Sequence, residues 1–318
     1  MFSGSIVALI TPMTASAEVD WDALAGLIEW HCEQGTHGIV PVGTTGESAT
    51  LTVDEHLQVI RRTVEIVAGR LPVIAGTGAN ATAEAIHLTR EAKDLGADAS
   101  LSVTPYYNRP TQEGLYQHYK AIAEAVDFPV VLYNVPPRTG CDLQAETVAR
   151  LAPIGNIVGI KEACGDYNRV REINAATPED FFVLSGEDGQ TLRMLELGAT
   201  GCISVTANVL PKKMSDFCSA FLAGDTALAE SLDAELQPIH EILFVESSPQ
   251  PTKWALYRMG KVDRGIRLPL LELSEAHRPE LLARLQTVGA LCCAPWRFYS
   301  LSVCSAAVRV STMTKAGS

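Results

Sequence analysis

Short runs of apolar residues recur through the first two thirds of the chain, and each ends at or just before a glycine, a threonine or another polar residue. The eight runs cover residues 5–10, 38–42, 72–76, 100–104, 129–134, 157–162, 181–186 and 201–205. They are apolar at consecutive positions, which is typical of strands buried on both faces of a parallel sheet. Their mean spacing of about 28 residues is the length of one strand–helix unit.

Helical patterns separate these runs. Residues 21–33 and 54–67 each place apolar side chains three and four positions apart, so that one face of the helix is apolar. Comparable segments cover residues 81–95, 112–126, 143–151, 168–175 and 190–197. We expect Asp20, Thr52 and Thr82 to cap three of these helices. Eight closely spaced units of the α/β class predict a closed (β/α)₈ TIM barrel rather than a doubly wound open sheet.

No strand is predicted after Val205. Helical patterns cover residues 211–222, 225–244, 252–259 and 274–291, and the first of them completes the eighth unit. We therefore expect a catalytic barrel over 1–223, a C-terminal helical extension over 224–291 and an atypical tail over 292–318. The tail has no acidic residue, and helical periodicity ends before it. We expect it to be mobile and to lie outside the fold.

Composition and charge exclude several classes of protein. The 318 residues are 47% hydrophobic, which is enough for a large core, and the net charge is −12. Nucleic acids and anionic membranes require a basic surface, so neither is an expected partner. No apolar run has the length of a membrane span, and the N-terminal residues lack the pattern of a signal peptide. We expect a cytoplasmic protein. The cysteines and histidines show no metal-ligand spacing, so no metal site is expected.

Candidate chemistry collects at the predicted carboxyl ends of the strands, where barrel enzymes carry their active sites. Lys161 ends the sixth strand among apolar neighbours. Desolvation there disfavours the ammonium form, so the amine can attack a carbonyl substrate and form a Schiff base. Tyr133 ends the neighbouring fifth strand, where its phenol can exchange protons with the amine. Arg138 follows in a rigid loop, where a guanidinium suits the capture of a carboxylate.

The second strand runs into a turn over residues 43–48, whose glycines, hydroxyls and amides can hold a carboxylate or a phosphate. The fourth strand is followed by Tyr107, which adds a second phenol. Each of these residues, taken singly, also fits a structural role such as packing or a solvated strand end. Their joint placement at the strand ends favours an active site.

Six segments carry a resemblance to a known family. They are GTTGESATL at 43–51, PVIAGTGANAT at 72–82, VTPYYNRPTQEGLYQHY at 103–119, LYNVPPRTGCDL at 132–143, IVGIKEA at 157–163 and ISVTANV at 203–209. The chain resembles the dihydrodipicolinate synthases, now called 4-hydroxy-tetrahydrodipicolinate synthases, over residues 1–291. The resemblance implies a lyase that condenses pyruvate with L-aspartate 4-semialdehyde in lysine biosynthesis, through a lysine Schiff base and without a metal or organic cofactor.

The resemblance also implies a role for each matching residue. Lys161 is the Schiff-base lysine, and Tyr133 is the proton donor and acceptor. Thr44 and Tyr107 complete a proton relay with Tyr133, and Tyr107 comes from the partner subunit. The relay therefore implies a homo-oligomer, and the family is usually a dimer of dimers.

Three further residues are implied to bind the substrates. Thr45 and the backbone of Ile203 hold pyruvate, whose carboxylate lies against the turn at Thr44 and Thr45. Arg138 meets the carboxylate of the semialdehyde. The segment 186–188, Gly-Glu-Asp, departs from the more common Gly-Asp-Asp at positions to which we assign no catalytic role.

The family also binds L-lysine as an effector in a cleft at its dimer interface. The matching residues in this chain are Ser48, Ala49, His56, Asn80, Glu84 and Tyr106. A carboxylate at Glu84 suits the α-ammonium of lysine, while the Asn80 amide and the Tyr106 hydroxyl suit its α-carboxylate. Val53 replaces a histidine of some lysine-inhibited members, so packing at an interface is the alternative role for this set.

Two other functions remain open on the sequence alone. Related pyruvate-dependent aldolases, such as N-acetylneuraminate lyase or a keto-sugar-acid aldolase, share Lys161, Tyr133 and a similar turn. Arg138 argues against them, because a sugar acid offers hydroxyl groups where this arginine would meet a carboxylate. A catalytically silent regulatory homologue would be expected to lack Lys161 or Tyr133, and the chain has both.

Overall fold

The computed structural model describes residues 2–291, and the tail predicted over 292–318 lies outside the described residues. Eight parallel strands alternate with helices along the first 222 residues. The strands are β1 (Gly4–Ala8), β2 (Gly38–Val40), β3 (Ile74–Gly76), β4 (Ala99–Val103), β5 (Val130–Asn134), β6 (Ile157–Glu162), β7 (Phe182–Ser185) and β8 (Gly201–Ser204). Each coincides with one of the apolar runs, within two residues at either end.

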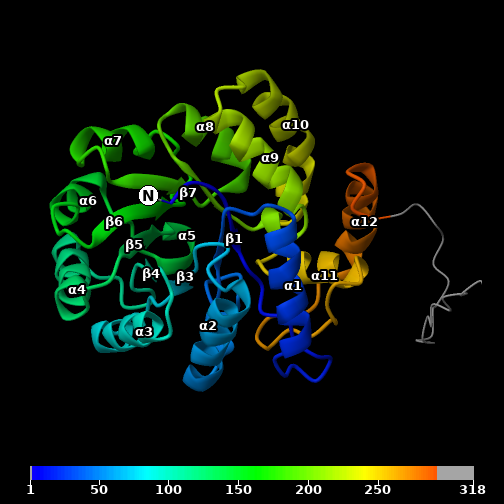
Figure 1. Ribbon diagram of the computed structural model, residues 1–318, viewed down its shortest axis with the longest axis horizontal. Coiled ribbons are helices and arrows are strands. Elements are labelled where there is room, and N and C mark those ends of the chain that lie inside the picture. Colours follow the sequence, from blue (N-terminus) through cyan, green and yellow to red (C-terminus); the bar gives the residue numbers. More distant parts are fainter. Residues whose placement is uncertain (1, 292–318) are drawn as a thin grey trace, which may run out of the picture.

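The sheet closes on itself. Its strand order is β2-β1-β8-β7-β6-β5-β4-β3, which leaves β2 and β3 as the two edges. A parallel bridge between Ile39 and Val73 joins these edges, and the Ile39 N–H donates to the Pro72 carbonyl at 2.9 Å. Figure 1 shows the strands in the centre with helices around them. The predicted (β/α)₈ barrel is confirmed.

The helices around the barrel are α1 (Trp21–Glu33), α2 (Val53–Val67), α3 (Thr82–Asp94), α4 (Gln112–Ala125), α6 (Ala145–Leu151), α7 (Arg169–Ala176), α8 (Thr191–Glu196) and α9 (Pro211–Leu222). Asp20 caps α1 and Thr52 caps α2, the latter in a reciprocal capping box. The predicted cap at Thr82 is wrong. Ala81 is the N-cap of α3, and the Thr82 hydroxyl instead shares a hydrogen bond of 2.9 Å with Nδ1 of His118.

Short helical segments complete the connections. The loop predicted after β5 is in part a four-residue helix, α5 (Pro136–Thr139), which begins with two prolines. Proline fits the first turn of a helix because the amide hydrogens there have no partner within the helix. Single 3₁₀ turns lie at Ser48–Thr50, Asp188–Gln190, Thr206–Asn208 and Glu275–His277.

The strands carry apolar side chains on both faces and so form two cores. Inward-facing residues such as Ile6, Val40 and Leu184 fill the barrel, while outward-facing residues such as Val7 and Ile39 pack against the helices. Successive side chains of a strand point to opposite faces, so each strand contributes to both cores. This explains why apolar residues occupy consecutive positions along each strand.

Three helices follow the barrel, as predicted for a C-terminal helical extension: α10 (Thr226–Ile242), α11 (Gln250–Arg258) and α12 (Arg278–Thr287). In Figure 1 α10 lies against α9, and α11 and α12 lie together at one side of the barrel. Treating residues 1–223 and 224–291 as separate domains stays a prediction. Among residues 2–291, no helix combines the length and the apolar character needed to cross a bilayer.

Candidate active site

Lys161 and Tyr133 lie side by side at the carboxyl ends of β6 and β5, where they are partners in the strand register. The Lys161 Nζ atom is 4.3 Å from the centre of the Tyr133 ring. The two residues are 6% and 7% exposed. The structure thus brings an amine and a phenol ring together at the barrel mouth, both largely buried, an arrangement that suits proton transfer to and from a reacting amine.

This alignment depends on a β-bulge in β6. The pairing of β5 with β6 shifts by one residue at Val131, which leaves Val158 as an extra residue in β6. A bulge changes the face to which the following side chains point. Without it, the register would set Ile160 rather than Lys161 opposite Tyr133. The bulge was not predicted with the strand, and its one local signal is Gly159, a glycine inside an otherwise apolar run.

Gly186, directly after β7, leaves room for the lysine side chain. A Cβ atom at this position would lie 2.9 Å from Cε of Lys161 and 2.8 Å from Cβ of Ala163, closer than side chains approach. Burial raises the pKa of the adjacent Glu187, while the charges of Lys161 and Arg138 act in the opposite direction. Sequence reasoning gave this segment no role, although its departure from the family pattern was visible.

The turn after β2 contains two backbone amides that have no acceptor among residues 2–291. The Gly46 N–H donates to the Gly43 carbonyl, and the Glu47 N–H donates to the Thr44 carbonyl, both at 3.1 Å. Within residues 2–291, no group accepts a hydrogen bond from the backbone N–H of Thr44 or Thr45. These amides are therefore available to a carboxylate, and the binding of a carboxylate here stays a prediction.

A buried ion pair anchors this turn to the C-terminal helices. Glu47 has a left-handed backbone, with φ of 57°, and is almost fully buried. One carboxylate oxygen accepts from Nζ of Lys253 in α11, and the other accepts from the Arg267 N–H at 3.1 Å. Burial lowers the pKa of Lys253, and the charge of Glu47 opposes that shift. Sequence reasoning missed this pair, for which the only local signal was a lysine on the buried face of α11.

A cavity of about 400 Å³ opens beside the site. Thr44 and Arg138 contribute to its lining, and Arg138 extends from α5 as an exposed side chain. Ile203 lies in β8 with its side chain in the inner core. Thr44, Thr45, Tyr133, Arg138, Lys161 and Ile203 thus all lie at or beside the carboxyl ends of the strands.

The same cavity contains most of the predicted effector residues. Ser48, Ala49, His56, Glu84 and Tyr106 line it. Asn80 is not among the lining residues, but its side-chain N–H donates to the Tyr106 carbonyl at 3.1 Å.

Electrostatic interaction couples two of these residues, and burial shifts the pKa of a third. Burial raises the pKa of Tyr106, and the negative charge of Glu84 raises it further. Burial also lowers the pKa of His56, whose Nε2 bonds the Gly76 carbonyl at 2.8 Å.

Tyr107 is the predicted residue that the single chain leaves outside the site. It is 92% exposed, and its φ of 72° lies in the left-handed region, which is uncommon for a tyrosine. Among the described residues, no hydrogen bond or ring contact joins it to Thr44 or Tyr133. Backbone strain of this kind concentrates at functional sites.

Comparisons with known proteins agree with one another. The model of the dihydrodipicolinate synthetase family matches residues 1–288. A 4-hydroxy-tetrahydrodipicolinate synthase of Alcanivorax borkumensis is 59% identical over 291 residues, which cover 92% of this chain and 99% of the relative.

Solved structures that resemble this chain are also dihydrodipicolinate synthases. The dihydrodipicolinate synthase of Acinetobacter baumannii, complexed with pyruvate, has a TM-score of 0.90 and 55% identity, and the match covers 92% of this chain and 100% of the other. The enzyme of Cyanidioschyzon merolae with lysine bound has a TM-score of 0.88 and 38% identity, over 91% and 99% of the two chains.

The buried pair predicts a large loss of stability in Lys253→Met. Removing one partner leaves the Glu47 charge buried and unpaired, which costs about 3–5 kcal/mol of unfolding free energy. Urea unfolding should show this loss, and adding Glu47→Gln should restore part of it. The control is Lys213→Met, which breaks a surface pair of 2.7 Å with Glu235 and should cost at most about 1 kcal/mol. Equal losses in the two single variants would contradict the anchoring role.

Proposed function

The chain belongs to the dihydrodipicolinate synthetase family, and from that premise we propose how its residues carry out the family reaction. Its activity is that of a 4-hydroxy-tetrahydrodipicolinate synthase, a lyase of diaminopimelate and lysine biosynthesis. Pyruvate condenses with L-aspartate 4-semialdehyde. The observation that carries the proposed mechanism is the nearly buried Lys161 amine, 4.3 Å from the ring centre of Tyr133.

In this proposal Lys161 forms the covalent intermediate. Its amine attacks the C2 carbonyl of pyruvate, and loss of water leaves an imine. Loss of a proton from C3 gives an enamine, whose C3 forms the new carbon–carbon bond with the aldehyde carbon. The amino group of the semialdehyde portion then attacks the imine carbon, closes the ring and releases the lysine. The imine is itself the electron sink, so the mechanism needs no metal or organic cofactor.

Tyr133 is the proposed proton donor and acceptor in these steps. Water can leave the tetrahedral intermediate only if its hydroxyl is protonated, and ring closure requires the proton to move again. Lys161 and Tyr133 are both largely buried, which supports proton transfer by the fixed phenol of Tyr133 rather than by solvent.

The substrate carboxylates take two different sites in this proposal. The carboxylate of pyruvate binds the free amides of the turn at Thr44 and Thr45, beside the Ile203 backbone. The carboxylate of the semialdehyde binds Arg138, whose exposed guanidinium lies at the cavity and can form a bidentate pair. This second carboxylate site distinguishes the synthase from aldolases that take a sugar acid. The relatives' names, all 4-hydroxy-tetrahydrodipicolinate synthase, favour the synthase reaction.

Thr44 and Tyr107 complete the proposed relay, with Tyr107 supplied by a partner subunit. Its exposure and its left-handed backbone support this role, because an exposed tyrosine held in a strained conformation suits insertion into a neighbouring chain. We therefore propose a homo-oligomer, assembled as a dimer of dimers. A cytoplasmic location stays part of the proposal.

The proposed role of Lys161 is tested by Lys161→Ala. The variant should lose nearly all turnover, because no imine can form, and borohydride should no longer trap pyruvate on the protein. The matched control is Lys212→Ala, an exposed lysine of α9, which should keep wild-type trapping. Wild-type trapping on Lys161→Ala would mean that another lysine is the nucleophile.

The proposed role of Arg138 is tested by Arg138→Ala. Loss of a charge-assisted hydrogen bond typically costs about 1.5–3 kcal/mol, so kcat/KM for the semialdehyde should fall about tenfold or more. Trapping of pyruvate should survive, because that step precedes semialdehyde binding. Arg171→Ala, an exposed arginine of α7, serves as the control. An unchanged kcat/KM would reject the role, and a gain with a sugar-acid substrate would favour the other aldolases.

We also propose that L-lysine binds in the cavity beside the active site. The relative from Cyanidioschyzon merolae has lysine bound, and the Glu84 carboxylate and the Tyr106 phenol of this chain line one cavity with Thr44 and Arg138. Tyr106 adjoins Tyr107, so a ligand there can couple to the relay through one backbone step.

Steady-state assays with millimolar L-lysine should show inhibition of the wild type and a weakened response in Glu84→Ala. Glu91→Ala, about two turns further along the same helix and outside the lining of the cavity, is the control and should keep the wild-type response. Undiminished inhibition of Glu84→Ala would place the effector elsewhere, and no inhibition in any variant would end the proposal.

A further inference from the structure

A second pair of residues lies directly behind the catalytic pair. Asn134 and Glu162 follow Tyr133 and Lys161 in their strands, and they are the next partners in the β5–β6 register. Because successive side chains point to opposite faces, these two side chains leave the barrel interior and lie on the helix side of the strands. Both are almost completely buried.

Asn134 uses every polar group of its side chain. Its amide N–H groups donate to the Glu162 carboxylate at 3.0 and 3.2 Å and to Oδ1 of Asp142 at 2.7 Å. Its carbonyl oxygen accepts from the Leu143 N–H at 2.9 Å. Glu162 in turn accepts from the Cys164 N–H at 2.8 Å. The side chain therefore ties β5 both to β6 and to the segment that returns from α5.

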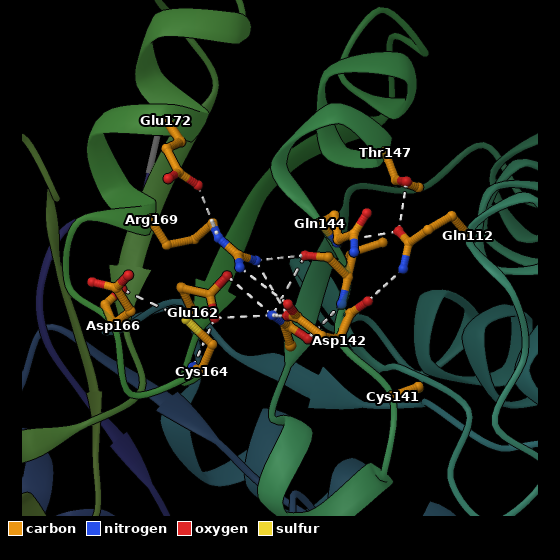
Figure 2. Close-up of polar contacts among 12 residues, drawn as sticks. Gln112, Cys141, Asp142, Gln144, Thr147, Glu162, Cys164, Asp166, Arg169 and Glu172 are labelled. Carbon is orange, nitrogen blue, oxygen red and sulfur yellow. Dashed lines mark hydrogen bonds and ion pairs between the residues drawn. The ribbon is translucent and has the colours of Figure 1, made fainter.

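The network continues to the surface through a charged pair. Asp142 pairs with the guanidinium of Arg169, the first residue of α7, at 3.0 Å, and Arg169 also pairs with Glu172 at 3.1 Å. Figure 2 shows Arg169 between Asp142 and Glu172, with Glu162 beneath it. The network thus holds both ends of the segment between β5 and α6, the segment that carries Arg138.

We propose that Asn134 and Glu162 are positioning residues for the condensation, and that their hydrogen bond on the outer face of the barrel holds Tyr133, Lys161 and Arg138 in reacting geometry. This inference rests on the proposed function, because it concerns the same three side chains. Asn134 acts on Tyr133 through the adjacent backbone and on Arg138 through Leu143 and Asp142. Glu162 acts on Lys161 through the adjacent backbone.

The chemistry explains why such support is needed. Imine formation and carbon–carbon bond formation each require reacting atoms to be aligned, and a displacement of about 1 Å can cost about 100-fold in rate. Burial raises the pKa of Glu162 to about 7, while the Asn134 and Cys164 donors oppose the shift. A glutamine can reproduce the neutral form and keep one acceptor for both donors, so Glu162→Gln is the conservative variant.

The test compares two asparagines that support the same two strands. Asn134→Ala removes the network at the carboxyl end. Asn156→Ala removes an asparagine at the opposite end, just before β6, whose side-chain N–H groups donate to the Ala123, Val126 and Phe128 carbonyls at 2.9–3.3 Å. Each variant is assayed for Tm, for kcat, for the two KM values and for the rate at which borohydride-trappable imine forms.

Asn134→Ala should lower kcat and the rate of imine formation by about 10- to 100-fold, with a smaller change in the KM for pyruvate. Asn156→Ala should lower Tm while kcat stays within about twofold of the wild type, because that end of the barrel carries no reacting group. Glu162→Gln should recover most of the rate that Glu162→Ala loses. If Asn134→Ala changes kcat no more than Asn156→Ala does at a similar loss of Tm, the positioning role is overturned.

Two further variants keep the result interpretable. Asp142 is partly exposed, so Asp142→Ala should fold even where Asn134→Ala does not. Its kcat should also fall, but by less than the kcat of Asn134→Ala. An unchanged kcat in folded Asp142→Ala would then overturn the proposal.

Lys161→Ala separates the two inferences. If it still traps pyruvate, the proposed catalytic role of Lys161 fails; if it does not and Asn134→Ala is normal, only the positioning role fails.

Discussion

The register between β5 and β6 is the constraint on which the active site depends. It sets Tyr133 opposite Lys161 inside the barrel and Asn134 opposite Glu162 outside it. Because side chains alternate between faces, a slip of one residue in β6 would exchange its inner and outer side chains and send the amine out of the pocket. The bulge at Val158 and the outer hydrogen bonds both work against such a slip. In our proposal, chemistry on the inner face is coupled in this way to polar contacts on the outer face.

The rest of the site is assembled around this pair by parts of the chain that are distant in sequence. The turn after β2 contains amides that have no acceptor among residues 2–291, and its Glu47 is fixed by Lys253, which lies 206 residues further along. Gly186 supplies the space that the lysine side chain occupies. The C-terminal helices therefore act as more than a cover for the barrel. They hold in place the turn to which we assign the pyruvate carboxylate.

Much of the fold could be predicted from the sequence, because it depends on local patterns. The eight apolar runs became the eight strands, and the capping box at Thr52 marks a helix start that needs no tertiary contact. Lys161, Tyr133 and Arg138 could be predicted to lie near one another, because the carboxyl ends of barrel strands meet at one mouth. Thr82 was misjudged since a threonine before an apolar pattern resembles a cap, whereas a tertiary bond to His118 engages its hydroxyl.

What could not be predicted depends on contacts between distant segments. The apolar residues of the run 157–160 fit either register with β5, and Gly159 indicates an irregularity without fixing which register forms. The pairing of Glu47 with Lys253 joins positions 206 residues apart, and its only local signal is the lysine on the buried face of α11. Asn134 and Glu162 look like ordinary strand-end residues until the register places them side by side.

The most direct test of this account is a crystal structure of the protein after borohydride reduction with pyruvate. The account predicts continuous density from Nζ of Lys161 to C2 of the reduced pyruvate, with its carboxylate against the Thr44–Thr45 turn and the Tyr133 ring beside the new bond. The Asn134–Glu162 hydrogen bond should be intact behind it. An adduct on a different lysine, or a Tyr133 ring turned away from the adduct, would contradict the account.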